Sequence, residues 1–324
     1  MGSLRHNGIG REHRSIRRLA EWVASGWRRA LAGLAVAFCI GAVQAQETAL
    51  RFAAVGDVPY FAWEELRFEQ MIEAWNREDL AFVLHVGDIK SGRDLCSGAL
   101  YTQRRALFDR SAHPFILLPG DNEWTDCHRQ YNGGFDPLER LALLRKVFYP
   151  DNRTLGVQPV ELTRHSTEFP EIVRWEHQGV VFVGLNVAGG HNGLRVSPAS
   201  DAEYERRNAV NLEWLASAFE HARRQQARAV VVAFHANPRF EARPGSPARE
   251  GYDHLVAALE RKARAFGKPV AVIHGDTHQY RVDYPLPSAP NLVRMEVLGS
   301  PGVGWTRVTV PRDGAAAFGF ELVK

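Results

Sequence analysis

The segments that decide the fold are LRFAAVGD at 50–57, AFVLHVGD at 81–88 and PFILLPGD at 114–121. Each is a short apolar run that ends in Gly-Asp, the pattern of a buried β-strand followed by a tight turn. Two later runs, AVVVAFH at 229–235 and VAVIHGDTH at 270–278, reach histidine at their ends. Because ligands of open α/β sheets bind beyond the carboxyl ends of strands, we expect these polar ends to meet along one edge.

Longer amphipathic stretches separate the apolar runs, with apolar residues at three- and four-residue intervals. Helices are therefore expected at 63–75, 99–109, 137–148, 201–224 and 252–266. Further strands are expected at 172–176, 180–185, 292–298, 306–310 and 317–322. Alternation of strands and helices followed by a β-rich end predicts two packed sheets with helices outside, in a single domain over residues 46–324.

The composition is that of an ordinary globular protein. The chain has 324 residues, of which 45% are hydrophobic and 24% charged, which excludes collagen, coiled coil and a wholly disordered chain. Residues 1–45 hold seven Arg and two Glu, a net +5, so the formal charge of +3 leaves about −2 for residues 46–324. The charge of the main body therefore gives no support to a nucleic-acid-binding surface.

Residues 1–45 have the features of a secretory signal peptide. An apolar run of 14 residues, 30–43, follows Arg28-Arg29, and small residues stand at the −3 and −1 positions of a cut after Ala45. The run is short for a helix that must cross about 30 Å of hydrocarbon. We expect export to the periplasm or the exterior, with no membrane span left after cleavage. An N-terminal membrane anchor or a buried helix is the alternative.

Removal of the leader takes Cys39 with it and leaves Cys96 and Cys127. An even pair of cysteines in an exported protein predicts one disulfide, and two unrelated buried thiols are the alternative. The bridge would tie together the segments that follow Asp88 and Asp121. It would close a loop of about 31 residues and contribute roughly 3–4 kcal/mol in the chain-entropy model.

The strand ends carry carboxylates and imidazoles together. A single Gly-Asp after a strand is ordinary turn chemistry. Three of them, with two histidines at later strand ends in the same order, predict a metal site instead. Carboxylate oxygen with imidazole nitrogen suits Mn, Fe, Zn or Mg, and no thiolate is available to favour a structural zinc site.

These five segments, in this order, resemble the motifs of the calcineurin-like metallophosphoesterases. The resemblance spans about residues 52–280 and includes NLEWL at 211–215 before the strand that ends at His235. It implies an α/β fold, a four-layer αββα sandwich of two mixed β-sheets flanked by helices, with a dinuclear metal centre. The implied ligands are Asp57 and His278 for the first ion, Asp88 as the bridge, and Asp121, His235 and Asp276 for the second.

Several positions depart from the family pattern. Pro59 stands where the first motif usually has a histidine ligand, and Asn122 where the third motif usually has a proton-donating histidine. Asn122 can hydrogen-bond a phosphate oxygen but cannot donate a proton as histidine does. Asp121 and Asp276 are carboxylates where the family usually has neutral ligands. Glu123 is expected to orient His235 or another ligand.

Those substitutions change the charge of the centre. Asp57, Asp88, Asp121 and Asp276 bring about −4, which offsets two divalent ions to near zero. The usual family set has two fewer carboxylates. This centre is therefore expected to attract dianions less strongly, or to hold harder ions such as Mg, Mn or Fe(III) beside a divalent partner. A phosphodiester is expected to suit it better than a highly charged monoester.

The resemblance implies metal-assisted hydrolysis of a small phosphate ester. A water or hydroxide held by the two ions attacks phosphorus in line, so no side-chain nucleophile is needed. A proton donor for the leaving group must replace the missing histidine. His191, in the glycine-rich segment 189–193, is a candidate, and a solvated loop histidine is the alternative. By residue type alone, the other candidates are His85, His128 and His165.

Pro59 and Asn122 also support a different class of function. A fold of this kind with weakened or lost hydrolysis would act as a metal- or ligand-binding module. A hydrolase with a serine nucleophile is a weaker rival, because the chain has no Gly-x-Ser-x-Gly sequence, and it also has no Walker-type loop for nucleotide hydrolysis. The sequence carries no signal for a particular oligomeric state.

Overall fold

The computed structural model describes residue 2, residues 49–310, residue 312 and residues 318–324. Apart from Gly2, the predicted leader 1–45 lies outside the described residues, so the signal peptide and its cleavage after Ala45 stay predictions. The first residue of the strand expected at 317–322 lies outside them as well.

The first sheet orders its described strands β12-β11-β1-β2-β3. Strands β1, β2 and β3 run parallel, whereas β11 and β12 are antiparallel to their neighbours. Val55, His85 and Leu117 pair across β1, β2 and β3, so the three parallel strands end level with one another. The bounds are β1 Leu50–Val55, β2 Val83–His85, β3 Phe115–Leu117, β11 Trp305–Val310 and β12 Gly319–Val323.

The second sheet orders its described strands β4-β5-β6-β7-β8-β10-β9. Strands β6, β7, β8 and β10 run parallel, and β4, β5 and β9 are antiparallel to their neighbours. Gly184, Ala233 and Ile273 pair across β6, β7 and β8. The bounds are β4 Thr163–Arg164, β5 Val173–His177, β6 Val180–Gly184, β7 Ala229–Ala233, β8 Val270–His274, β9 Arg281–Asp283 and β10 Leu292–Glu296.

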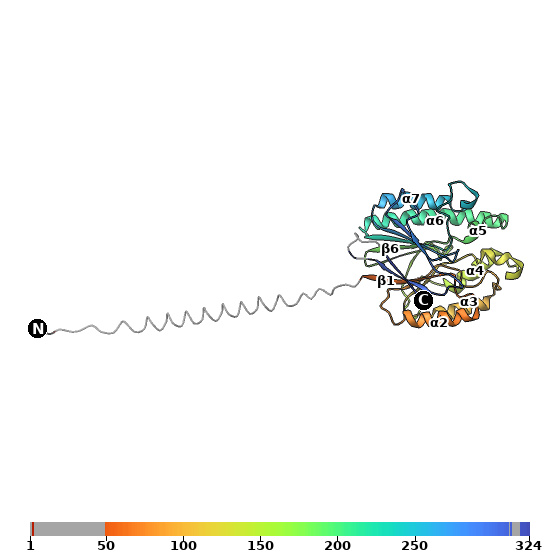
Figure 1. The fold of residues 1–324 in the computed structure, drawn as a ribbon, viewed down its shortest axis with the longest axis horizontal. Coiled ribbons are helices and arrows are strands. Elements are labelled where there is room, and N and C mark those ends of the chain that lie inside the picture. Colours follow the sequence, from red (N-terminus) through yellow and green to blue (C-terminus); the bar gives the residue numbers. More distant parts are fainter. Residues whose placement is uncertain (1, 3–48, 311, 313–317) are drawn as a thin grey trace. The chain divides into compact units, whose positions relative to one another are not determined.

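Helices cover the outer face of each sheet. In Figure 1, α2, α3 and α4 lie on the side of the five-stranded sheet, and α5, α6 and α7 on the side of the seven-stranded sheet. The predicted four-layer αββα sandwich is confirmed. The bounds are α2 Ala62–Trp75, α3 Gly98–Phe108, α4 Pro137–Phe148, α5 Gly189–Asn192, α6 Pro198–Arg224 and α7 Asp253–Phe266, with 3₁₀ turns at Thr125–His128, Gln130–Asn132 and Pro247–Arg249.

Local sequence explains where these helices begin. Ser97, Asp136 and Ser197 precede α3, α4 and α6, and their side chains accept hydrogen bonds from first-turn N–H groups. Pro137 and Pro198 then occupy the first turn, where a missing N–H costs nothing. Within the described part of the chain, no helix combines the length and the apolar character needed to cross a membrane.

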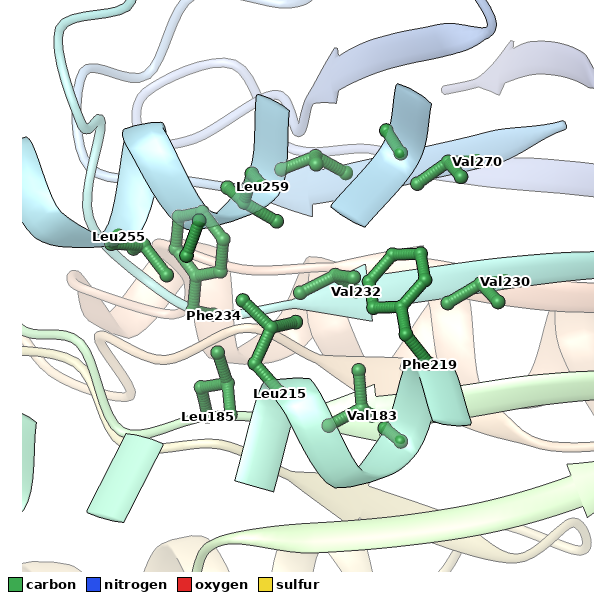
Figure 2. Close-up of a cluster of buried hydrophobic side chains, with 14 of the residues drawn as sticks. Val183, Leu185, Leu215, Phe219, Val230, Val232, Phe234, Leu255, Leu259 and Val270 are labelled. Atoms are coloured by element: carbon green, nitrogen blue, oxygen red, sulfur yellow. The ribbon is translucent and has the colours of Figure 1, made fainter. Parts of the chain in front are cut away.

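Three buried apolar clusters hold the four layers together. Alternate residues of β7 face opposite ways, because successive strand side chains point to opposite faces. Val230 and Val232 pack under α6 and α7 with Leu215 and Phe219 (Figure 2). Ala229, Val231 and Ala233 face the cluster between the sheets. A third cluster, which includes Phe68, Trp75 and Leu144, lies under α2, α3 and α4.

Cys96 and Cys127 form a disulfide, with their Cα atoms 5.8 Å apart and both side chains fully buried. The structure therefore has the bridge rather than two unrelated thiols. It joins the loop after β2 to the 3₁₀ turn after β3, and these are the two segments that follow Asp88 and Asp121.

Removal of this bridge is expected to lower the free energy of unfolding by about 3 kcal/mol, because the bridge restrains a loop between residues far apart in the unfolded chain. Urea unfolding of a Cys96→Ala/Cys127→Ala variant, compared with the oxidised protein, measures the difference. Reduced wild-type protein should unfold near the midpoint of the variant. An unchanged midpoint in both would contradict the prediction.

Candidate metal centre

Four of the predicted ligands adopt the left-handed backbone conformation at the ends of strands. Their φ angles are 56° at Asp57, 55° at Asp88, 82° at Asp276 and 59° at His278. Residues other than glycine rarely take positive φ, and such strain gathers at functional sites. In each case the chain leaves the sheet sharply just beyond the level ends of the parallel strands.

The described residues bring the predicted ligands together as two groups. One ligand atom from each of Asp57, Asp88 and His235 lies within 4.8 Å of the others, and the same holds for Asp121, His235 and Asp276. His235 belongs to both groups. His278 belongs to neither, but its Nε2 lies 3.6 Å from Asp57 Oδ1 at the edge of the first group.

The imidazole of His235 faces the carboxylates with a free nitrogen. Its Nδ1 lies 3.0 Å from the Val86 carbonyl and therefore carries a proton, which leaves Nε2 to face the carboxylates. Nε2 lies 2.8 Å from Asp121 Oδ1 and 3.4 Å from Asp88 Oδ1. Nε2 and Asp121 Oδ1 are buried without a hydrogen-bond partner among the described residues. Two lone pairs this close require a proton or a metal ion.

His278 is oriented in the same way. Its Nδ1 lies 2.7 Å from the Ser300 carbonyl, so this nitrogen carries the proton and Nε2 is left to face Asp57. Its side chain is 30% exposed, against none for Asp57. His278 therefore stands at the solvent side of the centre.

Tyr60 is a candidate functional residue that the sequence analysis missed. Its hydroxyl donates to Asp88 Oδ2 at 3.0 Å and lies 3.3 Å from His278 Nε2. The phenol thus sits between the proposed bridge and the outer histidine, next to Pro59, which replaces the usual histidine ligand. The available signal was an aromatic hydroxyl three residues after the first aspartate, in the order Gly-Asp-Val-Pro-Tyr.

Asn122 is committed to Asp88. Its Nδ2 donates to Asp88 Oδ2 at 2.6 Å and to the Lys90 carbonyl at 3.1 Å, and its backbone N–H donates to Asp88 Oδ1 at 3.0 Å. These bonds fix the orientation of the proposed bridging carboxylate. Contact between Asn122 and a phosphate oxygen stays a prediction.

Glu123 supports the turns of two strands. Its Oε1 accepts hydrogen bonds from the backbone N–H of Asp88 at 3.1 Å and of Gly120 at 2.6 Å. The structure therefore places it against the loops of Asp88 and Asp121, and it makes no hydrogen bond to His235 in the described part of the chain. A Cβ at position 120 would overlap the Asp88 carboxylate, so only glycine allows the two turns to approach.

Burial dominates the electrostatics of the centre. It raises the pKa of Asp57 to about 7, and it raises the pKa of Asp88 well above its usual range, in both cases against the pull of His235. It also raises the pKa of Asp276, to which Asp121 adds repulsion. Burial alone would lower the pKa of His235, but Asp88 and Asp121 outweigh it and hold that pKa well above its usual range. Carboxylates crowded in this way favour uptake of protons or cations.

His191 lies on a segment that touches the centre, but its ring is at the outside. A Cβ on Gly189 would lie 2.6 Å from Asp121 Oδ1, so the start of α5 packs directly on this carboxylate. The side chain of His191 is 45% exposed, and its Nδ1 lies 3.8 Å from Glu250 Oε2. Proton donation by His191 stays a prediction.

The donor set fits two hard or borderline metal ions. Four carboxylates and two imidazoles supply oxygen and nitrogen ligands, and backbone carbonyls orient both imidazoles so that Nε2 faces the carboxylates. A cation would satisfy the unpaired atoms of His235 and Asp121. We infer that Asp57 and His278 would hold one ion, Asp88 would bridge, and Asp121, His235 and Asp276 would hold the other.

A family model described as calcineurin-like phosphoesterase matches residues 50–280. The chain belongs to this family. The matched segment contains all six predicted ligands, and the resemblance found in the sequence is confirmed. Membership in the calcineurin-like phosphoesterases supports a metal-dependent phosphoesterase as the class of protein.

Solved structures show the same architecture at low identity. A dimetal phosphatase from Danio rerio is 13% identical, with a TM-score of 0.55 over 86% of this chain and 100% of that chain. GAP50, the anchor in the inner membrane complex of Plasmodium, is 11% identical, with a TM-score of 0.49 over 86% and 90%. The first likeness shows the fold alone. No curated protein matches the chain.

Metal uptake by the metal-free protein is expected to strengthen as the pH rises from about 4 to about 7. In the folded protein the Asp57 carboxyl keeps its proton up to a pKa of about 7, against an ordinary value of 3.8, and a metal ion binds the deprotonated form. Across this window the folded state binds more protons than the unfolded state, so rising pH destabilises the metal-free protein.

Calorimetric titration with Mn²⁺ or Zn²⁺ at several pH values between about 5 and about 7, in buffers of different ionisation enthalpy, measures both the affinity and the protons released. The expected result is an affinity that rises with pH together with proton release below pH of about 7. An affinity independent of pH, with no proton released, contradicts the prediction.

Proposed function

We propose that the protein is an exported phosphoesterase that uses two metal ions to hydrolyse a small phosphomonoester or phosphodiester. The observation that carries the proposal is the approach of His235 Nε2 to Asp121 Oδ1 at 2.8 Å, with no other partner for either atom among the described residues. The buried carboxylates of Asp57 and Asp88 and the partly buried carboxylate of Asp276 surround this pair. A metal ion satisfies the contact, and membership in the calcineurin-like phosphoesterases favours the metal over a proton.

The chain's own residues would orient the reacting groups. When bound, the ions supply Lewis-acid polarisation of the phosphoryl oxygens and acidify the water that serves as nucleophile. Asn122 and Tyr60 hold Asp88 Oδ2 by hydrogen bonds of 2.6 Å and 3.0 Å. The Tyr60 hydroxyl lies beside His278, which is partly exposed to solvent. Tyr60 and His191 are the candidate donors of a proton to the leaving group.

The charge of the centre favours diesters within this class. Four carboxylates offset two divalent ions to near zero, so a dianionic monoester gains little Coulomb attraction over a monoanionic diester. Export rests on the sequence of the leader, and the disulfide is compatible with an oxidising compartment. N-terminal sequencing of the mature protein tests export, because cleavage is expected after Ala45.

The test of the proposed function is turnover by protein that has been stripped of metal and reloaded with Mn, Zn, Mg or Fe. Hydrolysis is expected only in loaded protein, with an aryl diester preferred over the matching monoester. A strong preference for the monoester would contradict the charge argument. Bound metal without turnover of any ester would favour the second candidate function, a metal- or ligand-binding module. Pro59 and Asn122 support this candidate because they replace two histidines of the family pattern.

A further inference from the structure

Two aromatic side chains stand exposed at the start of α2. Phe61 and Trp63 keep 52% and 49% of their surface exposed, and Leu66, one turn further on, keeps 64%. The rings of Phe61 and Trp63 stack, with centroids 6.5 Å apart and planes 9° apart. We call these three residues the aromatic platform. Scattered exposed apolar residues are ordinary, but contiguous ones of this size mark a contact surface.

The fold does not need the aromatic platform. The opposite face of α2 packs into the core through Phe68, Met71, Ile72 and Trp75. Phe61 and Trp63 contact each other on the solvent side instead. Their exposure therefore costs hydration free energy without a compensating role in packing.

The aromatic platform begins at the residue after Tyr60, and Tyr60 touches the metal centre. The Tyr60 ring lies 5.4 Å from the His278 ring, and its hydroxyl touches Asp88. Phe61 is the next residue, and consecutive Cα atoms are about 3.8 Å apart. Glu64 accepts the backbone N–H of Tyr60 at 2.6 Å, and its own N–H donates to the Phe61 carbonyl at 2.9 Å. Tyr60 and the aromatic platform are thus held in fixed relation by the first turn of α2.

We propose that the aromatic platform binds the apolar, ring-bearing alcohol part of a phosphate ester whose phosphate lies at the metal centre. The proposal rests on the proposed function and names its substrate class: esters of aromatic alcohols rather than of sugars or glycerol. Two nearly parallel rings offer a flat surface for a third ring. A centre of nearly zero net charge draws little affinity from the phosphate, so the alcohol part must supply more of it.

A membrane surface is the rival occupant, and charge argues against it. Helix α2 carries four Glu and one Arg, whereas helices that lie on anionic lipid present Lys and Arg beside their apolar side chains. The acidic helix would be repelled by such lipid, but it does not oppose binding of an uncharged ring.

The experiment compares the metal-loaded protein with a Phe61→Ser/Trp63→Ser variant on two esters of primary alcohols, naphthylmethyl phosphate and glycerol phosphate, each as monoester and methyl diester. The variant is expected to lose about tenfold in kcat/KM on the naphthylmethyl esters and to keep its activity on the glycerol esters and its metal content. The matched control is Val157→Ser/Val160→Ser, which also removes two exposed apolar residues. The Val157 N–H donates to the Ser111 carbonyl. Ser111 precedes β3, so this control site lies at the end of β3 opposite to the metal centre.

Equal loss on both alcohols, or no loss on either, would overturn the proposal. So would binding to phosphatidylglycerol vesicles that depends on Phe61 and Trp63 while both esters are hydrolysed as before. Calorimetric binding of naphthylmethyl phosphonate, which cannot be hydrolysed, separates this proposal from the proposed function. Binding that weakens in the variant supports the aromatic platform even if no ester is turned over, and equal binding by both proteins counts against it.

Discussion

Replacement of Asp88 by asparagine is expected to reduce phosphate-ester hydrolysis by about 10³-fold or more, and to lower the bound metal from a pair of ions to one at most. Asp88 is the proposed bridging carboxylate, and it lies in the first group with Asp57 and His235. Its Oδ1 lies 3.4 Å from His235 Nε2, and its Oδ2 accepts bonds from Tyr60 and Asn122. Asparagine keeps the shape but removes the charge that would join two cations. Steady-state kinetics and metal analysis of the purified variant measure both effects.

The control for this variant is Asp79→Asn, which removes a carboxylate that pairs with Arg51 and whose side chain is 77% exposed. It should keep full activity and metal content. Retention of both ions would contradict the bridging role, and loss of activity through unfolding would contradict the electrostatic argument.

Strands and helices with strong periodicity were predictable from the sequence alone. The bounds of β1 and α4 agree with the expected segments 50–55 and 137–148. The sequence overestimated the length of the next parallel strands, since the run at 81–86 yields only β2, Val83–His85. The missed strands β4 and β9 have two and three residues. A hydrophobic period cannot be detected over so short a length.

The convergence of the ligands was predictable because the parallel strands end in register. The turn residues were not fully predictable, because their side-chain directions depend on backbone angles that few residues adopt. With φ of 56° at Asp57, the chain reaches Tyr60 and places its hydroxyl at Asp88. A comparison of sequence motifs shows only that Pro59 has replaced the histidine ligand of the family pattern. It does not show that the following side chain occupies the neighbouring space.

Glu64 links the loops that carry Asp57 and His278, the proposed ligands of the first ion, and it lies outside the five family motifs. Glu64, on α2, is fully buried. Its Oε2 accepts the N–H of Tyr60 and its Oε1 accepts the hydroxyl of Ser300, both at 2.6 Å. The Ser300 carbonyl in turn accepts Nδ1 of His278 at 2.7 Å, and the Ser300 N–H donates to the Asp57 carbonyl at 3.0 Å. One side chain thus positions Tyr60 and, through Ser300, the outer histidine.

Glu64→Gln is therefore expected to weaken binding of one ion about 10–100-fold, as loss of outer hydrogen bonds does in other metal sites, and to leave the other ion nearly unaffected. Glutamine turns one acceptor into a donor, so either Tyr60 or Ser300 loses its partner. Two-site calorimetric titration and the visible spectrum of the Co²⁺ protein resolve the two ions. Glu65→Gln, next along α2 and bonded to Arg104 at 2.8 Å, is the matched control. Equal weakening of both ions, or the same change in Glu65→Gln, would mean that α2 is destabilised as a whole and that Glu64 positions nothing.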